Sequence, residues 1–116
     1  PVREDEMIHF ECTVQEGCLS DDLRPRLASA IEKACRDALG HDGSPVEVSW
    51  TITLKGFGFR GGRPSTTSLV RGQIPDGCDQ ETRSRMLRSI GDSWCRITGA
   101  SAGELMVSAR DRSWSG

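Results

Sequence analysis

The sequence lacks the features that mark membrane, secreted or nucleic-acid-binding proteins. Its longest apolar runs fall far short of the roughly 20 residues that a membrane helix needs, and its polar, acidic start over residues 1–6 does not resemble a signal peptide. The formal net charge is only −2, which argues against electrostatic binding of nucleic acid. We therefore expect a cytoplasmic protein that binds no membrane and no nucleic acid, and whose partner is a small organic molecule or another protein.

Metal and cofactor motifs are also missing. The five cysteines are an odd number and form no C-x-x-C pair with which a zinc site could begin. Neither His9 nor His41 has a partner at metal-ligand or triad spacing. We predict no metal and no organic cofactor, and we interpret Cys12 and Cys35 as buried structural thiols.

What the sequence does contain is an internal repeat. Gly17-Cys18 recurs sixty residues later as Gly77-Cys78, and Ile31 matches Ile90 at a spacing of 59. One extra residue in the first copy explains the slip. At 116 residues the chain fits one domain. We predict a single domain over 1–116, with a first unit and its hairpin over 7–64 and a second unit over 65–116.

Each unit contains two predicted strands. Apolar and polar residues alternate strictly over 8–14 and over 46–52, which is the period of a strand with one buried face. The second unit repeats this pattern over 104–110 and, less regularly, over 68–74. Within the strand over 46–52 the alternation predicts that Trp50 is a core residue.

A helix is predicted between the strands of each unit. Apolar residues recur at spacings of three and four over 23–38 and over 86–97, and a glycine follows each stretch as a stop. Ser20 or Asp21 is expected to cap the first helix, and Asp79 the second. Three arginines of the second helix are interpreted as a solvated helix face: Arg83, Arg85 and Arg88.

Strand, helix and strand within one sheet form a right-handed parallel crossover. Two such units predict an α/β (α+β) fold in which a four-stranded mixed sheet carries both helices on one face. The opposite face would be largely polar, and oligomerisation is a natural way to cover it. The side chains expected on this polar face are His9, Glu11, Thr13, Glu47, Ser49 and Thr51.

A glycine-rich segment over 55–64 joins the two units. It contains a G-x-G-x-x-G sequence that begins at Gly56. A dinucleotide-binding loop of this kind must open a helix and be followed by an acidic residue about 20 positions later, but a proline and a Ser/Thr run come next here. We predict a β-hairpin whose phenylalanines, Phe57 and Phe59, are exposed or face a ligand.

The order of these elements resembles a known family. A strand, a turn at Gly17 with Ser20-Asp21-Asp22 at the helix start, a long helix, a second strand and a hairpin from Lys55-Gly56 to Gly61-Gly62 together resemble 4-oxalocrotonate tautomerase. The doubled arrangement is similar to the fused members of the tautomerase superfamily, such as malonate semialdehyde decarboxylase and the chloroacrylic acid dehalogenases. The resemblance covers residues 8–110.

The resemblance implies a tautomerase/MIF-like fold, a homotrimer and a catalytic N-terminal proline that works without a cofactor. Pro1 is the corresponding candidate. Its α-amino group would titrate near ~7.7–8.0 unperturbed, and desolvation beside cationic neighbours lowers such a pKa to give a base usable at neutral pH. The family's proline opens the first strand, however, and that position aligns with Ile8, seven residues later. Either the extra segment folds back to deliver the amine, or the chemistry has been lost or moved.

The resemblance also implies arginines that hold the carboxylate of an anionic substrate. Family members often place one directly after the turn glycine, where both units of this chain have cysteine. The remaining candidates are Arg71, Arg63 and Arg60, with solvent exposure or subunit contacts as alternative roles. Phe57 and Phe59 either wall the substrate pocket or pack in a core or an interface.

Three functions are compatible with the sequence. The first is a cofactor-independent enzyme, an isomerase or a lyase/hydratase-type catalyst, that transfers a proton on a small carbonyl compound or an unsaturated carboxylic acid with Pro1 as acid/base. The second is a divergent member in which Glu11, Glu47 or Asp76 replaces the proline. The third is a catalytically silent binding or interaction protein on the same fold. We favour an enzyme because the turn and hairpin architecture is present in full.

Overall fold

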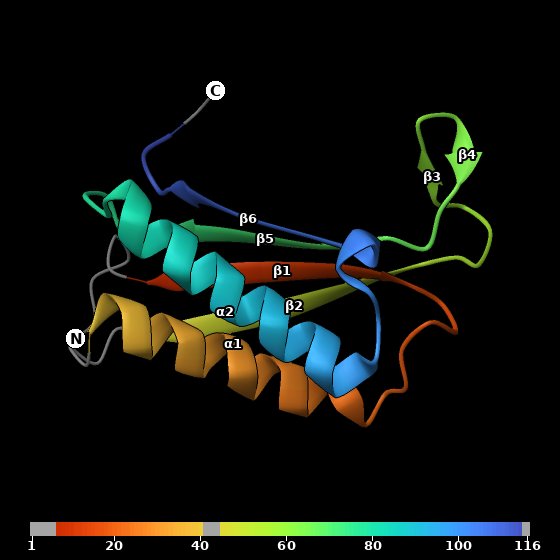
Figure 1. Cartoon of the computed structure of the whole chain (residues 1–116), viewed down its shortest axis with the longest axis horizontal. Coiled ribbons are helices and arrows are strands. Elements are labelled where there is room, and N and C mark those ends of the chain that lie inside the picture. Colours follow the sequence, from red (N-terminus) through yellow and green to blue (C-terminus); the bar gives the residue numbers. More distant parts are fainter. Residues whose placement is uncertain (1–6, 41–44, 115–116) are drawn as a thin grey trace.

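The computed structural model describes residues 7–40 and 45–114 (Figure 1). The first unit contributes β1 (Ile8–Gln15), α1 (Leu23–Leu39), β2 (Val46–Thr53) and the short paired strands β3 (Phe59–Arg60) and β4 (Arg63–Pro64). The second unit contributes β5 (Ser68–Ile74), α2 (Gln80–Thr98), the 3-10 helix η2 (Ala102–Glu104) and β6 (Leu105–Asp111). The last strand begins one residue later than the alternation predicts, because Glu104 closes η2.

The main sheet has the strand order β2-β1-β5-β6. β1 pairs parallel with β2, and β5 pairs parallel with β6, whereas the two central strands β1 and β5 run antiparallel. Both helices lie on one face of this sheet (Figure 1), which confirms the predicted α+β fold. Because the central strands are antiparallel, the start of β1 lies beside the end of β5.

The core lies between the sheet and the helices. The alternation in β1 turns Ile8, Phe10, Cys12 and Val14 toward the helices, and each is at most 3% exposed. The Phe10 ring lies against Gly72 of β5, where an added Cβ atom would come within 2.4 Å of the ring. Only glycine leaves room for this ring. Strand β5 adds two more buried side chains, Val70 and Ile74. The large buried side chains of the helices are Leu27, Ile31, Met86, Ile90 and Trp94.

Trp50, predicted to be a core residue, is partly buried. Its ring stacks on that of Trp94, with ring centroids 6.0 Å apart and an interplanar angle of 28°. β2 is an edge strand of the sheet, so its inward side chains are covered from fewer directions than those of β1. Trp50 therefore packs at the border of the core.

The two helices begin differently. Asp79 caps α2 as predicted, and its carboxylate accepts a hydrogen bond of 2.7 Å from a backbone N–H of the first turn. The prediction that Ser20 or Asp21 caps α1 is wrong, because Asp22 precedes this helix and its side chain makes no capping bond. The Ser20 hydroxyl donates to Asp22 instead. The Asp21 carboxylate pairs with the guanidinium of Arg24.

The prediction of a solvated arginine face on α2 is wrong for Arg83. Arg85 and Arg88 are exposed, but the side chain of Arg83 is only 16% exposed and its guanidinium lies 2.6 Å from the carboxylate of Asp111. Arg83 also donates to the carbonyl oxygen of Ala109 at 2.7 Å. Helical spacing could not reveal these contacts, since both partners belong to β6.

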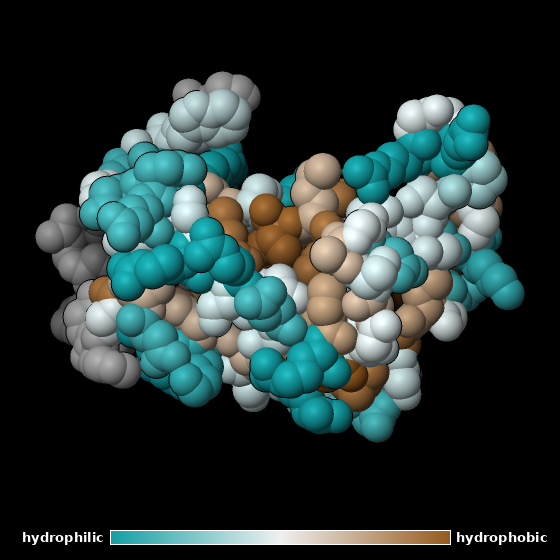
Figure 2. Space-filling model, in the orientation of Figure 1, coloured by the Kyte–Doolittle hydropathy of each residue, from teal (hydrophilic) through white to brown (hydrophobic). Residues whose placement is uncertain are grey.

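Figure 2 shows the face that carries the helices. Hydrophobic surface gathers in its middle, and hydrophilic surface borders it along the helices and at the hairpin. Over the whole described surface the exposed large apolar side chains are Ile52, Leu54, Phe57, Phe59, Met106 and Trp114. Within the described residues, neither helix combines the length and the apolar character needed to cross a membrane.

Candidate functional site

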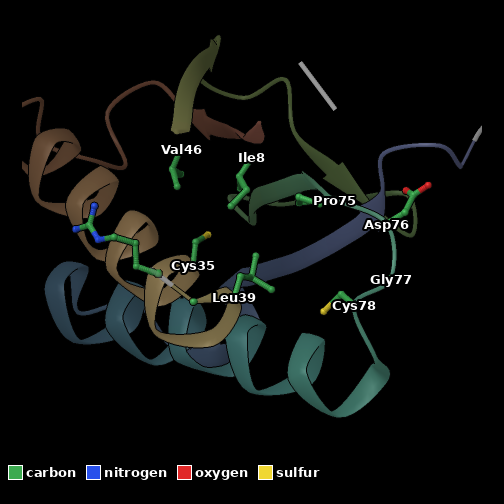
Figure 3. Close-up of a pocket in the computed structure, with 10 residues that line it drawn as sticks. Ile8, Cys35, Leu39, Val46, Pro75, Asp76, Gly77 and Cys78 are labelled. Atoms are coloured by element: carbon green, nitrogen blue, oxygen red, sulfur yellow. The ribbon is translucent and has the colours of Figure 1, made fainter. Parts of the chain in front are cut away.

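A cavity of about 230 Å³ lies at the start of β1 (Figure 3). Four segments meet there: the first residue of β1, the last turn of α1, the first residue of β2 and the turn between β5 and α2. The backbone N–H of Ile8 donates to the carbonyl of Pro45 at 3.0 Å, which fixes the strand start. We call this the strand-end cavity. Its described lining residues are Ile8, Cys35, Arg36, Leu39, Gly40, Val46, Pro75, Asp76, Gly77 and Cys78.

The inner wall of the strand-end cavity is apolar. Figure 3 shows Ile8 and Val46 on one side and Cys35 and Leu39 on the other, with their side chains directed toward one another. Ile8 is 3% exposed and Cys35 is fully buried. Burial raises the pKa of the Cys35 thiol to about 12. This thiol is therefore protonated near neutral pH and is inert as a nucleophile.

The charged residues among the described lining are bound within the chain. Arg36 pairs with Glu32, one turn earlier in α1. The Asp76 carboxylate accepts a hydrogen bond of 3.1 Å from the backbone N–H of Ser113, and hydrogen bonds from Ser113 lower the pKa of Asp76. Asp76 is thus an ionised carboxylate near neutral pH. Between Arg36 and Asp76, the cavity is bordered by the apolar wall.

The strand-end cavity brings together two positions that the family resemblance marks. Ile8 opens the first strand, where the family's proline lies, and Cys78 follows the turn glycine, where family members often have arginine. Burial raises the pKa of Cys78 as well. The two residues belong to different units and meet because β1 and β5 are antiparallel. Pro1, the predicted catalytic residue, lies outside the described residues, seven positions before Ile8.

Arg71 lies on the opposite, polar face of the sheet. Its guanidinium is 3.3 Å from the carboxylate of Glu11. On the same face His9 Nδ1 lies 3.2 Å from a carboxylate oxygen of Glu47, and His9 Nε2 lies 3.4 Å from the hydroxyl of Ser49. These contacts connect β2, β1 and β5, and Arg71, Glu11 and His9 border an open hollow of about 560 Å³. The predicted polar face is therefore present as a network of paired side chains.

The hairpin lies at the other end of the sheet from the strand-end cavity (Figure 1). Gln15, the last residue of β1, ties it there. The Gln15 amide donates to the carbonyl of Ser65 at 3.2 Å and accepts from the backbone N–H of Gly56 at 3.3 Å. Because the full length of β1 separates Gln15 from Ile8, the hairpin does not approach the strand-end cavity of its own chain.

The predicted substrate-binding residues of the hairpin are exposed. Phe57 is 71% exposed and Phe59 is 64% exposed. Arg60 donates to the carbonyl of Gly103 at 3.1 Å, and Arg63 is exposed on β4. Phe59 and Arg60 also border a second cavity of about 230 Å³ between the hairpin and the sheet. Arg71, the hairpin residues and Ile8 thus occupy three separate places in one chain.

Sequence reasoning missed Leu39, Val46 and Pro75 as wall residues of a cavity. The alternation over 46–52 identifies Val46 as inward-facing, and Leu39 lies just beyond the predicted helical stripe. Neither pattern shows which elements meet at its end. Within the described residues, no group of three or more His, Cys, Asp or Glu side chains is placed to hold a metal ion.

Together, the fold and the cavity define a class of protein: a duplicated β-α-β chain with a polar sheet face and a small apolar site at the start of its first strand. The crystal structure of native Ps01740 is similar to this chain with a TM-score of 0.83 and 34% sequence identity, over 89% of this chain and 92% of that one. No protein-family model and no curated protein sequence matches the chain.

Two more distant structures share the fold. The Q0 fused 4-OT symmetric trimer is 14% identical with a TM-score of 0.80, over 89% of this chain and 84% of that one. N1, a member of the cis-3-chloroacrylic acid dehalogenase family, is 16% identical with a TM-score of 0.80, over 89% of this chain and 73% of that one. The chain belongs to the tautomerase superfamily.

Proposed function

We propose that the chain is a cofactor-independent tautomerase-superfamily enzyme that transfers a proton on a small carbonyl compound or an unsaturated carboxylic acid, as an isomerase or as a lyase/hydratase-type catalyst. The observation that carries this proposal is the strand-end cavity at Ile8, because the resemblance assigns the catalytic group to the first residue of this strand. A small apolar cavity also lowers the pKa of an amine that enters it, which yields a base near neutral pH.

Pro1 is the proposed catalytic base. A segment of seven residues can span at most roughly 25 Å when extended, which is ample for a chain to fold back on a strand that begins at Ile8. In this mechanism the secondary amine removes a proton from the carbon next to the substrate carbonyl and returns it at the same or a conjugated position. The apolar wall excludes water that would otherwise compete for the amine.

A homotrimer is the proposed assembly, and it gives the distant arginines a role. Phe57, Phe59, Arg60 and Arg63 lie too far along the sheet to serve the cavity of their own chain, so we propose that they serve a neighbouring copy. Where the substrate is an acid, these arginines and Arg71 would hold its carboxylate between copies. The trimeric state of the Q0 fused 4-OT supports this assembly.

A side-chain mechanism is the alternative. Of the three carboxylates considered, Asp76 borders the strand-end cavity, whereas Glu11 and Glu47 are paired on the polar face. The lowered pKa of Asp76 makes it a weaker base than a desolvated amine. A binding protein without catalysis remains the third possibility, and it predicts ligand binding with no proton exchange.

The test is deuterium incorporation, followed by NMR in D₂O, at the carbon next to the carbonyl of short ketones and 2-oxo acids, together with isomerisation of unsaturated acids. Protein prepared with Pro1 as a free amine is compared with the same protein after N-terminal acetylation. We expect exchange that acetylation abolishes. Exchange that survives acetylation but is lost in Asp76→Asn would make Asp76 the catalytic base in place of Pro1. No exchange on any compound would refute the proposal that the chain is an enzyme.

A further inference from the structure

The strand-end cavity restricts the charge of its ligand. Among the described lining, the charges of Arg36 and Asp76 are already paired within the chain. The last turn of α1 borders the cavity through Leu39 and Gly40, and the carbonyl groups at a helix C-terminus carry partial negative charge. A ligand anion would therefore enter beside a negative helix end and compete with Glu32 for Arg36.

Two thiols form part of the cavity wall, of which Cys35 is fully buried and Cys78 is partly exposed. Cys35 comes from α1 and Cys78 from the turn that precedes α2, and burial is the first cause that raises the pKa of each. A wall that disfavours a thiolate also disfavours a ligand carboxylate, because each charged group must give up its water. An uncharged carbonyl group gives up much less on entry.

We propose that the strand-end cavity binds a short, uncharged aldehyde or ketone in preference to a carboxylate. The apolar chain of this ligand lies against Ile8, Leu39 and Val46, and its carbonyl group stays toward the cavity mouth. The inference rests on the proposed function and narrows its two substrate classes to one.

The test compares 2-pentanone with butanoate, which share a three-carbon chain and differ by a methyl group in place of a charged oxygen. Binding is followed near neutral pH through the amide chemical shifts of ¹⁵N-labelled protein, with Ile8, Val46 and Cys78 as reporters. We expect the dissociation constant of 2-pentanone to be lower than that of butanoate by about tenfold or more. Tenfold corresponds to ~1.4 kcal/mol, which is well within the cost of burying an unpaired carboxylate.

Cys78→Arg and Cys18→Arg form a matched pair of variants. Each residue follows the turn glycine of its own unit, but Cys18 is exposed and Cys78 borders the cavity. Cys78→Arg adds a cation to the wall, so we expect it to strengthen butanoate binding and remove the preference for the ketone. Cys18→Arg should leave both affinities unchanged.

Butanoate that binds the unmodified protein as tightly as 2-pentanone would overturn the inference. Failure of both compounds to shift the three reporters would overturn it as well. Neither result by itself refutes catalysis, which is judged by deuterium exchange on both compound classes. Conversely, ketone binding at the reporters without exchange on any compound would uphold the inference and refute the enzyme.

Discussion

The two units share one sequence pattern, yet equivalent positions have different surroundings. After the turn glycine, Cys18 of the first unit is exposed, whereas Cys78 of the second borders the strand-end cavity. Arg24 forms a pair at the surface, but its equivalent Arg83 is held by Asp111 of β6. The repeat thus determines which helices and strands each unit forms. The neighbouring elements determine the burial and the contacts of each equivalent residue.

The central strands show the same asymmetry inside the core. Phe10 and Val70 are equivalent positions and both are fully buried. The larger ring fits because Gly72, the equivalent of Cys12, leaves space for it in the neighbouring strand. The first unit therefore contributes a large side chain, and the second contributes the glycine that leaves space for it.

The largest expected effect comes from removing that bulk. Phe10→Ala should lower the free energy of unfolding by about 3–5 kcal/mol, because it deletes a buried ring and leaves a cavity. Val70→Ala should cost roughly half as much, since it deletes two methyl groups at about 0.8 kcal/mol each plus a smaller cavity. Urea unfolding of both variants measures the difference, and equal losses would break the proposed asymmetry of the core.

Filling the space opposite Phe10 should have the next largest effect. Gly72→Ala places a methyl group against the ring and should destabilise the protein by about 1–3 kcal/mol. Gly103→Ala is the control, because an added Cβ there has no neighbour within 4 Å. Combining Gly72→Ala with Phe10→Leu should cost less than the sum of the two single changes. Strict additivity in urea unfolding would show that the ring and the glycine are not coupled.

Replacing the equivalent arginines, Arg24 and Arg83, should change the free energy of unfolding by smaller amounts. Arg83→Met removes charged hydrogen bonds to Asp111 and Ala109 and should cost about 1–3 kcal/mol. Arg24→Met removes an i,i+3 surface pair and should cost no more than about 0.5 kcal/mol. Thermal unfolding of the two variants compares them directly. A larger loss from Arg24→Met would mean that the contact between α2 and β6 does not anchor the second unit.

Substitutions at the helix starts should have the smallest effect on stability, and this effect should depend on pH. Hydrogen bonds from Thr82 lower the pKa of Asp79, so the folded state favours the carboxylate. Its contribution to stability is present above the ordinary aspartate pKa and is lost as the pH falls through the lowered value. Asp79→Ala should therefore lower the melting temperature near neutral pH, and this loss should shrink in acid. Ser20→Ala, the equivalent change in α1, should leave the melting temperature nearly unchanged at both pH values.

Local patterns were sufficient to predict the strands of the main sheet, both α-helices and the hairpin, but not the 3-10 helix η2. Strict alternation over 8–14 located β1 and its buried side chains, and the spacing of apolar residues located both helices. The repeat then predicted a sheet with one polar face. These signals succeed because each depends on a residue and its near neighbours in the chain.

The site depended on contacts that these patterns do not contain. Nothing local determines that β1 and β5 run antiparallel, and without that direction Ile8 and Cys78 cannot be placed in one cavity. Arg83 was misjudged for the same reason, since Asp111 lies 28 residues away. The alignment that places Ile8 at the family's proline position came from the resemblance, and Pro1 itself stays a prediction.

The decisive question is whether proton transfer occurs at the strand-end cavity. Val46 borders that cavity, and Leu105 is its equivalent at the start of β6. Deuterium exchange next to the carbonyl of 2-pentanone would be measured for Val46→Trp and Leu105→Trp, each shown by circular dichroism to be folded. We expect Val46→Trp, which fills the cavity, to abolish exchange and Leu105→Trp to retain it. Full exchange by folded Val46→Trp protein would contradict the assignment of the active site to this cavity.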